Sequence, residues 1–173
     1  KSFVGNDPFA VLYGDDVIIS QKPAIGQLMG VYEEYEKSVV GIKSVATELL
    51  PSYCTLGVNP VRDNIYSVFD MIEKPLPSEI ISNFAILGRC VLTPDIFSLL
   101  ESTPPSRNGE IQLTDAMRTV AKQGNMMGIE YEGVRYDMGS KLGILQAIVE
   151  VGLSHPEVGE GFRSYLKGIA ASL

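Results

Sequence analysis

The sequence predicts an α/β protein in which a mixed, mostly parallel sheet is flanked by helices. Short apolar runs rich in β-branched residues alternate with longer segments whose apolar residues recur every three or four positions. Residues 9–45 follow the order strand, helix, strand, which is typical of a βαβ unit with both strands in one sheet. The sheet should therefore be at least partly parallel, and we expect parallel pairs to be in the majority.

Composition and charge limit the classes of function. The chain has 173 residues, 45% of them hydrophobic, which is enough for one domain over residues 1–173 with a sizeable core. A formal charge of −7 argues against a nucleic-acid partner, although a small phosphorylated ligand needs only one or two local cations. No apolar run approaches the ~18 residues that cross a bilayer, so we expect no membrane partner. The two cysteines, Cys54 and Cys90, show no regular spacing and indicate reduced, buried thiols in a cytoplasmic protein.

The first predicted strand, residues 9–12, ends at an acidic turn. Gly14 follows the strand, and the adjacent carboxylates of Asp15 and Asp16 come next. In open α/β sheets ligands bind beyond the carboxyl ends of strands, where acids can hold a cation against a bound phosphate. The alternative is a structural turn in which Gly14 takes a positive φ and the two aspartates cap backbone amides.

A second charged strand end lies further along the chain. A helix that begins near Pro23 and a strand over residues 39–45 lead to residues 51–72, which indicate two strands able to pair as a hairpin. The second of these strands ends in Glu73 and Lys74 before a proline, so the two charges are expected on opposite sides of the strand end. The alternative is an ordinary solvated surface.

The rest of the chain continues to alternate strands and helices and contains a third acid. The predicted elements are a strand over residues 82–92, a helix capped by Thr93, a helix over residues 116–122 capped by Thr114, a strand over residues 126–132 and a final helix over residues 156–173. Asp137 lies just ahead of another helix N-terminus, and Gly139 allows close backbone approach to a ligand there.

Five phrases along the chain match the motifs of one enzyme family in order and spacing. They are LYGDD (residues 12–16), IEKP (residues 72–75), SNFAILGR (residues 82–89), NGEIQLTDA (residues 108–116) and RYDMGSKLG (residues 135–143). On these residues the chain resembles the bacterial UTP–glucose-1-phosphate uridylyltransferases, the UDP-glucose pyrophosphorylases of the sugar-nucleotidyltransferase family. The resemblance implies a Rossmann-like fold, here in an N-terminally truncated version. It also implies a reaction that forms UDP-glucose and pyrophosphate from UTP and glucose 1-phosphate.

The resemblance implies roles for four charged residues. Asp15 and Asp137 would hold a Mg²⁺ ion that bridges the phosphates of UTP or UDP-glucose, and with Lys74 they would make up the catalytic set. Glu73 would accept hydrogen bonds from glucose hydroxyls, and Lys74 would meet the sugar phosphate. These residue types suit the roles, because Mg²⁺ takes one or two carboxylates plus substrate oxygens, and a lysine ammonium offers three donors.

The resemblance also implies substrate contacts at Cys54, Gly57 and Asn83. Asn83 lies in the third of the five phrases. In much of the family the backbone of a glycine directly after a tyrosine touches the sugar. Here Tyr53 is followed by Cys54, and the nearest glycine is Gly57. The contact is therefore expected in this region, through one or other of these backbone groups.

One part of the family pattern is missing. The family's nucleotide loop, rich in glycine, arginine and lysine, has no counterpart in the sequence. The chain is therefore expected to be the C-terminal, sugar- and metal-binding part of the enzyme, inactive by itself. The choice of base stays open, so a thymidylyl- or cytidylyltransferase is an alternative, and a non-catalytic binding or assembly module is another. An uncovered sheet edge would favour a homo-oligomer or pairing with the N-terminal segment.

Overall fold

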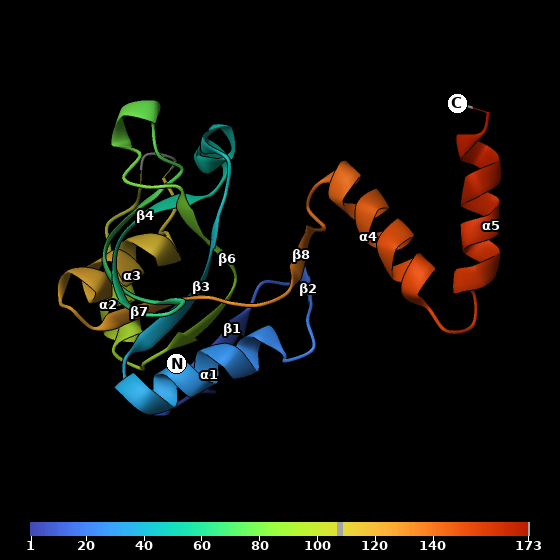
Figure 1. The fold of residues 1–173 in the computed structure, drawn as a ribbon. Helices are drawn as coiled ribbons and strands as arrows, with labels where there is room; N and C mark the ends of the chain where they lie inside the picture. The colour runs from blue at the N-terminus through green and yellow to red at the C-terminus, as the bar shows by residue number, and fades with distance from the viewer. Residues whose placement is uncertain (107–108, 173) are drawn as a thin grey trace. The chain divides into compact units, whose positions relative to one another are not determined.

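The structure, a computed structural model, describes residues 1–106 and 109–172 (Figure 1). Asn108 of the fourth phrase and Leu173 of the predicted last helix lie outside the described residues. The chain divides into two compact units, which we call the sheet unit (Lys1–Tyr13 and Ile18–Val134) and the helix-pair unit (Gly14–Val17 and Arg135–Leu173). That the two behave as one domain over residues 1–173 stays a prediction.

A six-stranded mixed sheet forms the centre of the sheet unit. Its strands, in their order across the sheet, are β1 (Phe9–Leu12), β6 (Phe84–Leu92), β3 (Ser38–Ser44), β7 (Met126–Glu130), β5 (Ile65–Glu73) and β4 (Cys54–Arg62). Within the described residues, β3 and β7 pair in parallel and the other four pairings are antiparallel. The prediction of a mixed sheet flanked by helices is confirmed, but the expected majority of parallel pairs is wrong.

Two features of the chain path account for most of the antiparallel pairings in the sheet. The predicted hairpin is confirmed: β4 and β5 are joined through Asp63 and Asn64, and so short a connection allows only antiparallel pairing. β6 lies between β1 and β3 and runs antiparallel to both. The strands of the predicted βαβ unit thus run in the same direction, but a third strand separates them.

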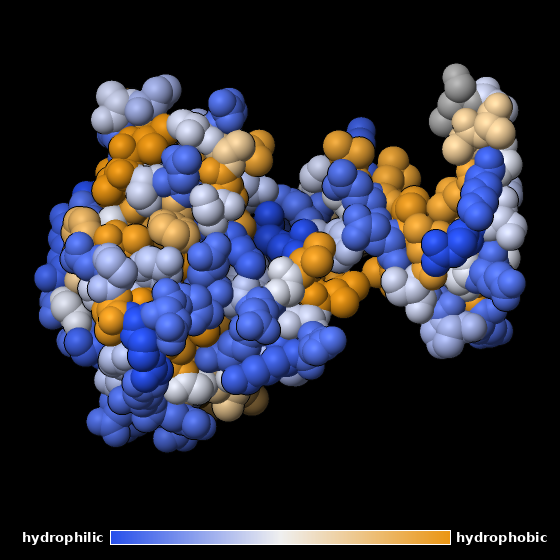
Figure 2. All heavy atoms as spheres, viewed as in Figure 1, coloured by the Kyte–Doolittle hydropathy of each residue, from blue (hydrophilic) through white to orange (hydrophobic). Residues whose placement is uncertain are grey.

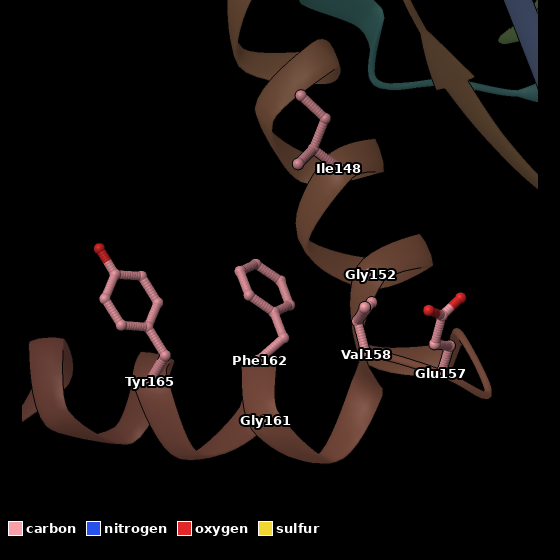
Figure 3. A pocket seen from close by; sticks show the side chains of 7 residues that line it. All are labelled: Ile148, Gly152, Glu157, Val158, Gly161, Phe162 and Tyr165. Atoms are coloured by element: carbon pink, nitrogen blue, oxygen red, sulfur yellow. The ribbon is translucent and has the colours of Figure 1, made fainter.

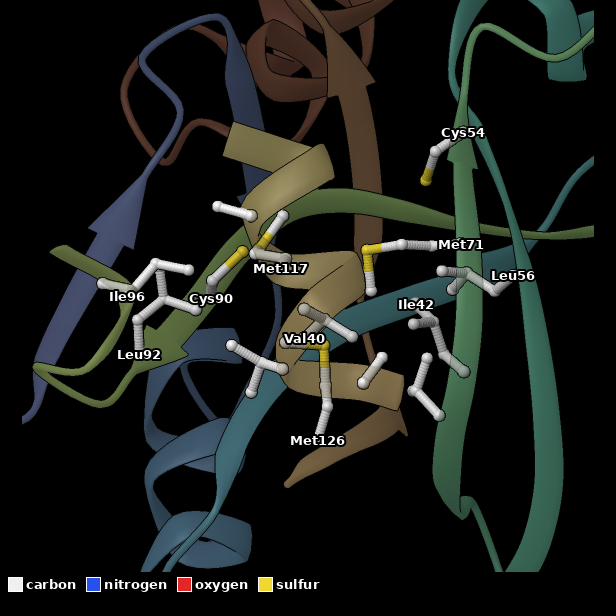
Figure 4. Close-up of a cluster of buried hydrophobic side chains, with 14 residues drawn as sticks. Val40, Ile42, Cys54, Leu56, Met71, Cys90, Leu92, Ile96, Met117 and Met126 are labelled. Atoms are coloured by element: carbon white, nitrogen blue, oxygen red, sulfur yellow. The ribbon is translucent and has the colours of Figure 1, made fainter. Parts of the chain in front are cut away.

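Helices cover both faces of this sheet. α1 (Ala24–Tyr35) packs on one face, where Leu28 lies in a buried cluster with Val39. α2 (Ile96–Ser102) and α3 (Leu113–Lys122) pack on the other face, where Val40 and Met117 belong to the larger buried cluster (Figure 4). Val39 and Val40 are both fully buried because successive side chains of a strand point to opposite faces.

The sheet unit also contains two short 3₁₀ helices, and it tests the predictions for the cap at Thr93 and for the two cysteines. Two short 3₁₀ helices, η1 (Thr47–Ser52) and η2 (Pro77–Glu79), precede β4 and follow β5. The predicted cap at Thr93 is wrong, because α2 is capped at Asp95 and the Thr93 hydroxyl donates to the Asp95 carboxylate instead. Cys54 and Cys90 are buried free thiols, as predicted.

The helix-pair unit contains two helices and the acidic segments that precede them. β2 (Asp16–Ile19) and β8 (Val134–Asp137) form a two-stranded sheet, and each strand has residues in both units. α4 (Lys141–Ser154) is capped by Ser140, and α5 (Gly159–Ala170) confirms the predicted final helix with a later start. Within residues 1–106 and 109–172, every helix is too short or too polar to span a bilayer.

Candidate active site

Asp15 and Asp137 come together in the helix-pair unit. The backbone carbonyl of Asp15 accepts a hydrogen bond from the Met138 N–H at 2.7 Å, which joins the two acidic segments. The Gly139 N–H donates to Asp137 Oδ1 at 3.0 Å. A Cβ atom at Gly139 would lie 3.2 Å from Asp137 Oδ1 and 3.6 Å from Asp15 Oδ2. Both carboxylates therefore border one space, which the glycine leaves open.

Asp16, the neighbour of Asp15, has a different role in this turn. Its carboxylate is 9% exposed and forms an ion pair with the Arg135 guanidinium. Arg135 Nη2 also lies 3.3 Å from Asp137 Oδ2. Burial raises the pKa of Asp16, and the guanidinium of Arg135 opposes that rise. Asp16 therefore holds Arg135 in place, and Arg135 in turn contacts the second oxygen of Asp137.

Asp15 and Asp137 fit the ligand set that Mg²⁺ usually takes. Mg²⁺ is held by one or two protein carboxylates, and substrate oxygens and waters complete an octahedron at about 2.0–2.1 Å. Among the residues that the structure describes, no cluster of three or more histidine, cysteine, aspartate or glutamate side chains could hold a metal ion by itself. The two carboxylates around the space at Gly139 match the Mg²⁺ sites in which the protein supplies only one or two carboxylates and the substrate and water supply the other ligands. The metal role of this pair stays a prediction.

Glu73, at the end of β5, receives a hydrogen bond from a helix far away in sequence. Thr114 Oγ1 donates to Glu73 Oε2 at 2.8 Å. The predicted cap at Thr114 is wrong, because α3 begins at Leu113 with Gln112 as its cap. Burial raises the pKa of Glu73, while the Thr114 hydrogen bond and the Lys74 ammonium act against that rise. The sequence pattern predicts a helix start at Thr114 and does not indicate that the Thr114 hydroxyl binds Glu73.

Lys74 leaves the strand in a left-handed conformation. Its φ is +44°, and its N–H donates to the Tyr53 carbonyl at 2.7 Å. Glu73 and Lys74 consequently line the same cavity of about 390 Å³, and the expectation that they point to opposite sides is wrong. Among the described residues, Ile72, Glu79, Ser106, Gln112, Asp115 and Arg118 also line this cavity. Carboxylates and cations both line this cavity, with the Glu73 carboxylate and the Lys74 ammonium adjacent in sequence, and such a mixture suits a ligand that offers both hydroxyls and a phosphate.

The other three predicted substrate residues have packing or loop roles. Cys54 is 4% exposed, and burial raises the pKa of its thiol to about 12. A Cβ atom at Gly57 would lie 2.5 Å from the Phe69 ring, so this glycine makes room for the ring. Asn83 Oδ1 accepts a hydrogen bond from Thr47 Oγ1 at 3.3 Å. None of the three lines the described part of the cavity beside Glu73, and their substrate contacts stay predictions.

A separate apolar cavity lies between α4 and α5. Its volume is about 650 Å³, and Ile148, Phe162 and Tyr165 are among the residues that line it (Figure 3). Figure 2 shows apolar side chains gathered along the facing sides of the two helices. Neither Asp15 nor Asp137 lines this cavity, so it is distinct from the acidic turn of the same unit.

Curated proteins are similar to nearly all of the chain, although no protein-family model matches it. The UTP–glucose-1-phosphate uridylyltransferase YngB of Bacillus subtilis strain 168 is 42% identical over 169 residues, which cover 98% of this chain and 57% of the relative. A UTP–glucose-1-phosphate uridylyltransferase of Staphylococcus epidermidis is 41% identical over 167 residues, which cover 96% of this chain and 58% of the relative. The chain thus spans about 58% of the length of these relatives.

Solved structures of similar proteins share the fold. A UDP-glucose pyrophosphorylase complexed with UDP-glucose is 36% identical with a TM-score of 0.79, and the match covers 96% of this chain and 59% of the other. The UTP-bound UGPase from Acinetobacter baumannii is 30% identical with a TM-score of 0.84, and the match covers 95% and 57%. The resemblance inferred from the five phrases is confirmed: over nearly all of its length, this chain is homologous to UTP–glucose-1-phosphate uridylyltransferases.

Proposed function

We propose that the protein containing this chain is a nucleotidyltransferase that forms UDP-glucose and pyrophosphate from UTP and glucose 1-phosphate. The observation that carries the proposal is the similarity of nearly the whole chain to proteins named for this activity. The cavity beside β5 supports it, because Glu73 and Lys74 line it together and offer acceptors for hydroxyls next to a cation for phosphate.

In the proposed reaction, a phosphate oxygen of glucose 1-phosphate attacks the α-phosphorus of UTP, and the bond to the pyrophosphate leaving group breaks. No side chain has to form a covalent intermediate, so the protein acts by positioning the reactants and by complementing their charge. Lys74 would hold the sugar phosphate, and Glu73 would accept hydrogen bonds from the sugar hydroxyls. Lys74 suits this role because it is exposed at the edge of the cavity and carries three donors.

We further propose that Asp15 and Asp137 hold the Mg²⁺ ion of this reaction. Bound there, Mg²⁺ would neutralise negative charge on the phosphates during transfer. Asp137 would offer Oδ1 to the ion, since Arg135 lies against Oδ2. The space beside Gly139, which both carboxylates border, supports the assignment.

The finer properties of the whole protein are further proposals. Selection of uracil rests on the names of the relatives, and a thymidylyl- or cytidylyltransferase remains the alternative. A cytoplasmic location, a homo-oligomer or pairing with an N-terminal segment, and a non-catalytic assembly role also stay predictions.

Pyrophosphate release from UTP and glucose 1-phosphate, with Mg²⁺ present, tests the proposed function. It is measured on the longest natural polypeptide that carries this chain, with ATP, CTP and TTP as the competing nucleotides. Lys74→Ala should lower kcat roughly 10²–10³-fold, the usual effect of removing one donor from a reacting group, and Asp137→Ala should also lose most activity. Lys167→Ala, at an exposed lysine of α5, is the control. Near-normal turnover of Lys74→Ala, or a preference for another nucleotide, would contradict the proposal.

A further inference from the structure

We propose that Thr114 is a positioning residue, which fixes the Glu73 carboxylate so that it accepts hydrogen bonds from the hydroxyls of a hexose phosphate. The inference rests on the proposed function, because that function places the sugar at Glu73. Thr114 Oγ1 lies 2.8 Å from Glu73 Oε2, and the hydrogen bond is partly buried. Since Glu73 lines the cavity of about 390 Å³, the bond holds the carboxylate at the wall that a ligand would meet.

α3 gives Thr114 a rigid support. The helix presents a continuous apolar face to the core, formed by Ala116, Met117, Val120 and Ala121, each no more than 1% exposed. This face packs into the cluster that also contains Val68 and Met71 of β5, the strand that ends in Glu73 (Figure 4). The donor and the acceptor are therefore attached to two elements that the same core holds together, and the hydroxyl needs little further ordering.

A second polar contact joins the same helix to the same strand. Arg118, one turn after Thr114, donates through Nε to Asp70 Oδ1 at 2.6 Å and through Nη2 to Asp70 Oδ2 at 3.1 Å. A bidentate pair of this kind restricts the geometry more than a single hydrogen bond does. Two contacts, Thr114 with Glu73 and Arg118 with Asp70, thus set how α3 lies along β5.

The Thr114 hydroxyl orients Glu73 without neutralising it. A carboxylate has about four acceptor positions on its two oxygens, and Thr114 uses one of them on Oε2. With respect to the described residues, the positions on Oε1 and the remaining one on Oε2 are left for ligand hydroxyls. A cation in the place of Thr114 would compensate the charge that makes these acceptors strong.

Thr114 also favours the ionised form of Glu73. Burial raises the pKa of Glu73, and the nearby Asp115 carboxylate adds to the rise. The Thr114 hydroxyl and the Lys74 ammonium lower that pKa. Removing the hydroxyl therefore weakens Glu73 as an acceptor in two ways. The carboxylate is no longer oriented by Thr114, and its raised pKa favours the protonated form, in which the proton occupies one acceptor position.

Three variants of the full chain separate the hydroxyl from other properties of the side chain. Thr114→Val removes the hydroxyl and keeps the shape, and Thr114→Ser keeps the hydroxyl. Thr119→Val makes the same chemical change on the same helix, at an exposed threonine whose hydroxyl donates to the Asp115 backbone carbonyl at 3.5 Å. Three quantities are measured for each variant: the pKa of Glu73 by NMR titration without ligand, the dissociation constant of glucose 1-phosphate and the dissociation constant of inorganic phosphate.

We expect Thr114→Val to raise the pKa of Glu73 and to weaken glucose 1-phosphate binding roughly tenfold, as for the loss of a hydrogen bond to a charged group. Inorganic phosphate has no sugar hydroxyls, so its binding should not change. Thr114→Ser and Thr119→Val should match the wild type in all three quantities. A glucose 1-phosphate affinity in Thr114→Val equal to that of the wild type would overturn the inference, as would an equal loss for both ligands.

The titration distinguishes failure of this inference from failure of the proposed function. If the wild-type chain does not bind glucose 1-phosphate, the sugar role of Glu73 fails together with the function on which it rests. A raised pKa of Glu73 in Thr114→Val, restored in Thr114→Ser, would then still support positioning of the carboxylate by Thr114. A Glu73 pKa that Thr114→Val leaves unchanged would overturn the positioning role, whatever the wild type binds.

Discussion

The two carboxylate sites, one in each unit, are held by different kinds of partner. Glu73 in the sheet unit accepts a hydrogen bond from the neutral hydroxyl of Thr114, whereas Asp137 in the helix-pair unit lies against the guanidinium of Arg135. A hydroxyl orients a carboxylate and leaves its charge for a ligand. A guanidinium compensates charge, which a turn with three nearby acids needs when no metal ion is bound. The cavity of Glu73 also holds the carboxylates of Glu79 and Asp115, so the two sites differ in the partner of the central carboxylate and not in the number of acids.

The structural supports of the two sites differ as well. Glu73 ends a strand that packs against α3 through a fully buried core. The segments of Asp15 and Asp137 are joined by the pairing of β2 with β8, by the backbone hydrogen bond from Met138 to Asp15 and by the ion pair of Arg135 with Asp16. We therefore expect the acidic turn to depend on polar contacts more than the end of β5 does.

Arg135→Met should have the largest effect on stability. It leaves the Asp16 carboxylate, 9% exposed, without its cation, and breaking a mostly buried pair in this way costs about 3–5 kcal/mol. Chemical denaturation gives the change in unfolding free energy. The double variant Asp16→Asn with Arg135→Met should recover part of the loss, because no buried charge is left uncompensated. A loss of unfolding free energy below about 1 kcal/mol in Arg135→Met would contradict the expectation that the acidic turn depends on polar contacts more than the end of β5 does.

Gly139→Ala should affect metal binding without unfolding the protein. The added methyl group would lie 3.2 Å from Asp137 Oδ1 and 3.6 Å from Asp15 Oδ2, in the space that both carboxylates border. We expect the affinity for Mn²⁺, a paramagnetic substitute for Mg²⁺, to fall roughly tenfold in a relaxation titration, within the range for disturbed metal sites. The unfolding free energy should stay within about 0.5 kcal/mol. Gly161→Ala, where a Cβ atom meets nothing within 4 Å, is the control, and an unchanged Mn²⁺ affinity would argue against a shared ion.

Arg118→Met should destabilise the sheet unit by only about 1 kcal/mol. Its side chain is 35% exposed and that of Asp70 is 23% exposed, so water screens the pair and solvates Asp70 when the cation is lost. The same denaturation experiment, with Arg163→Met on α5 as the exposed control, measures the difference. If Arg118→Met lowers the unfolding free energy as much as Arg135→Met does, the core between α3 and β5 is not the main support of the Glu73 site.

The pH dependence of stability should show the smallest effect and opposite signs for two acids of β5. Burial raises the pKa of Glu73 above its ordinary value of 4.5, so its contribution is fully present below that value and is lost as the pH rises through the folded-state pKa. The hydrogen bond from Arg118 lowers the pKa of Asp70 below 3.8, so its contribution is present above that value and is lost as the pH falls.

Unfolding measured between about pH 3 and about pH 7 tests these signs. The wild type should lose stability relative to Glu73→Gln as the pH rises from about 4.5. Relative to Asp70→Asn, the wild type should lose stability as the pH falls below about 4. Parallel pH profiles for the wild type and Glu73→Gln would show that burial of Glu73 has no energetic consequence.

Most elements of the fold follow from short stretches of sequence. The helix after Pro23 is predicted by its apolar spacing, and the hairpin over residues 51–72 by its turn residues; both are confirmed. Their accuracy has a simple reason, because helix periodicity and tight turns depend on neighbours a few residues apart. The direction of the sheet was predicted wrongly, because it depends on β6, which enters between β1 and β3 from about fifty residues further along the chain.

The candidate site divides in the same way. The residue types of Asp15, Glu73, Lys74 and Asp137 identify the chemistry, and the five phrases identify the family. The left-handed backbone at Lys74, which puts it on the same cavity as Glu73, was not predicted, because a lysine rarely adopts a positive φ without tertiary constraint. The sequence predicts Thr114 as a helix cap, since nothing local distinguishes a cap from a hydroxyl that donates to another strand.

The amino-acid sequence is enough to predict most of the elements, the positions of the charged side chains and the enzymes that this chain resembles, because each of these depends on residues close together along the chain. The ion pair of Asp16 with Arg135, the hydrogen bond of Thr114 with Glu73 and the gap at Gly139 that faces two acids become visible only in the folded protein. The ion pair and the hydrogen bond join residues 119 and 41 positions apart, and they meet through the pairing of β2 with β8 and the packing of α3 on β5.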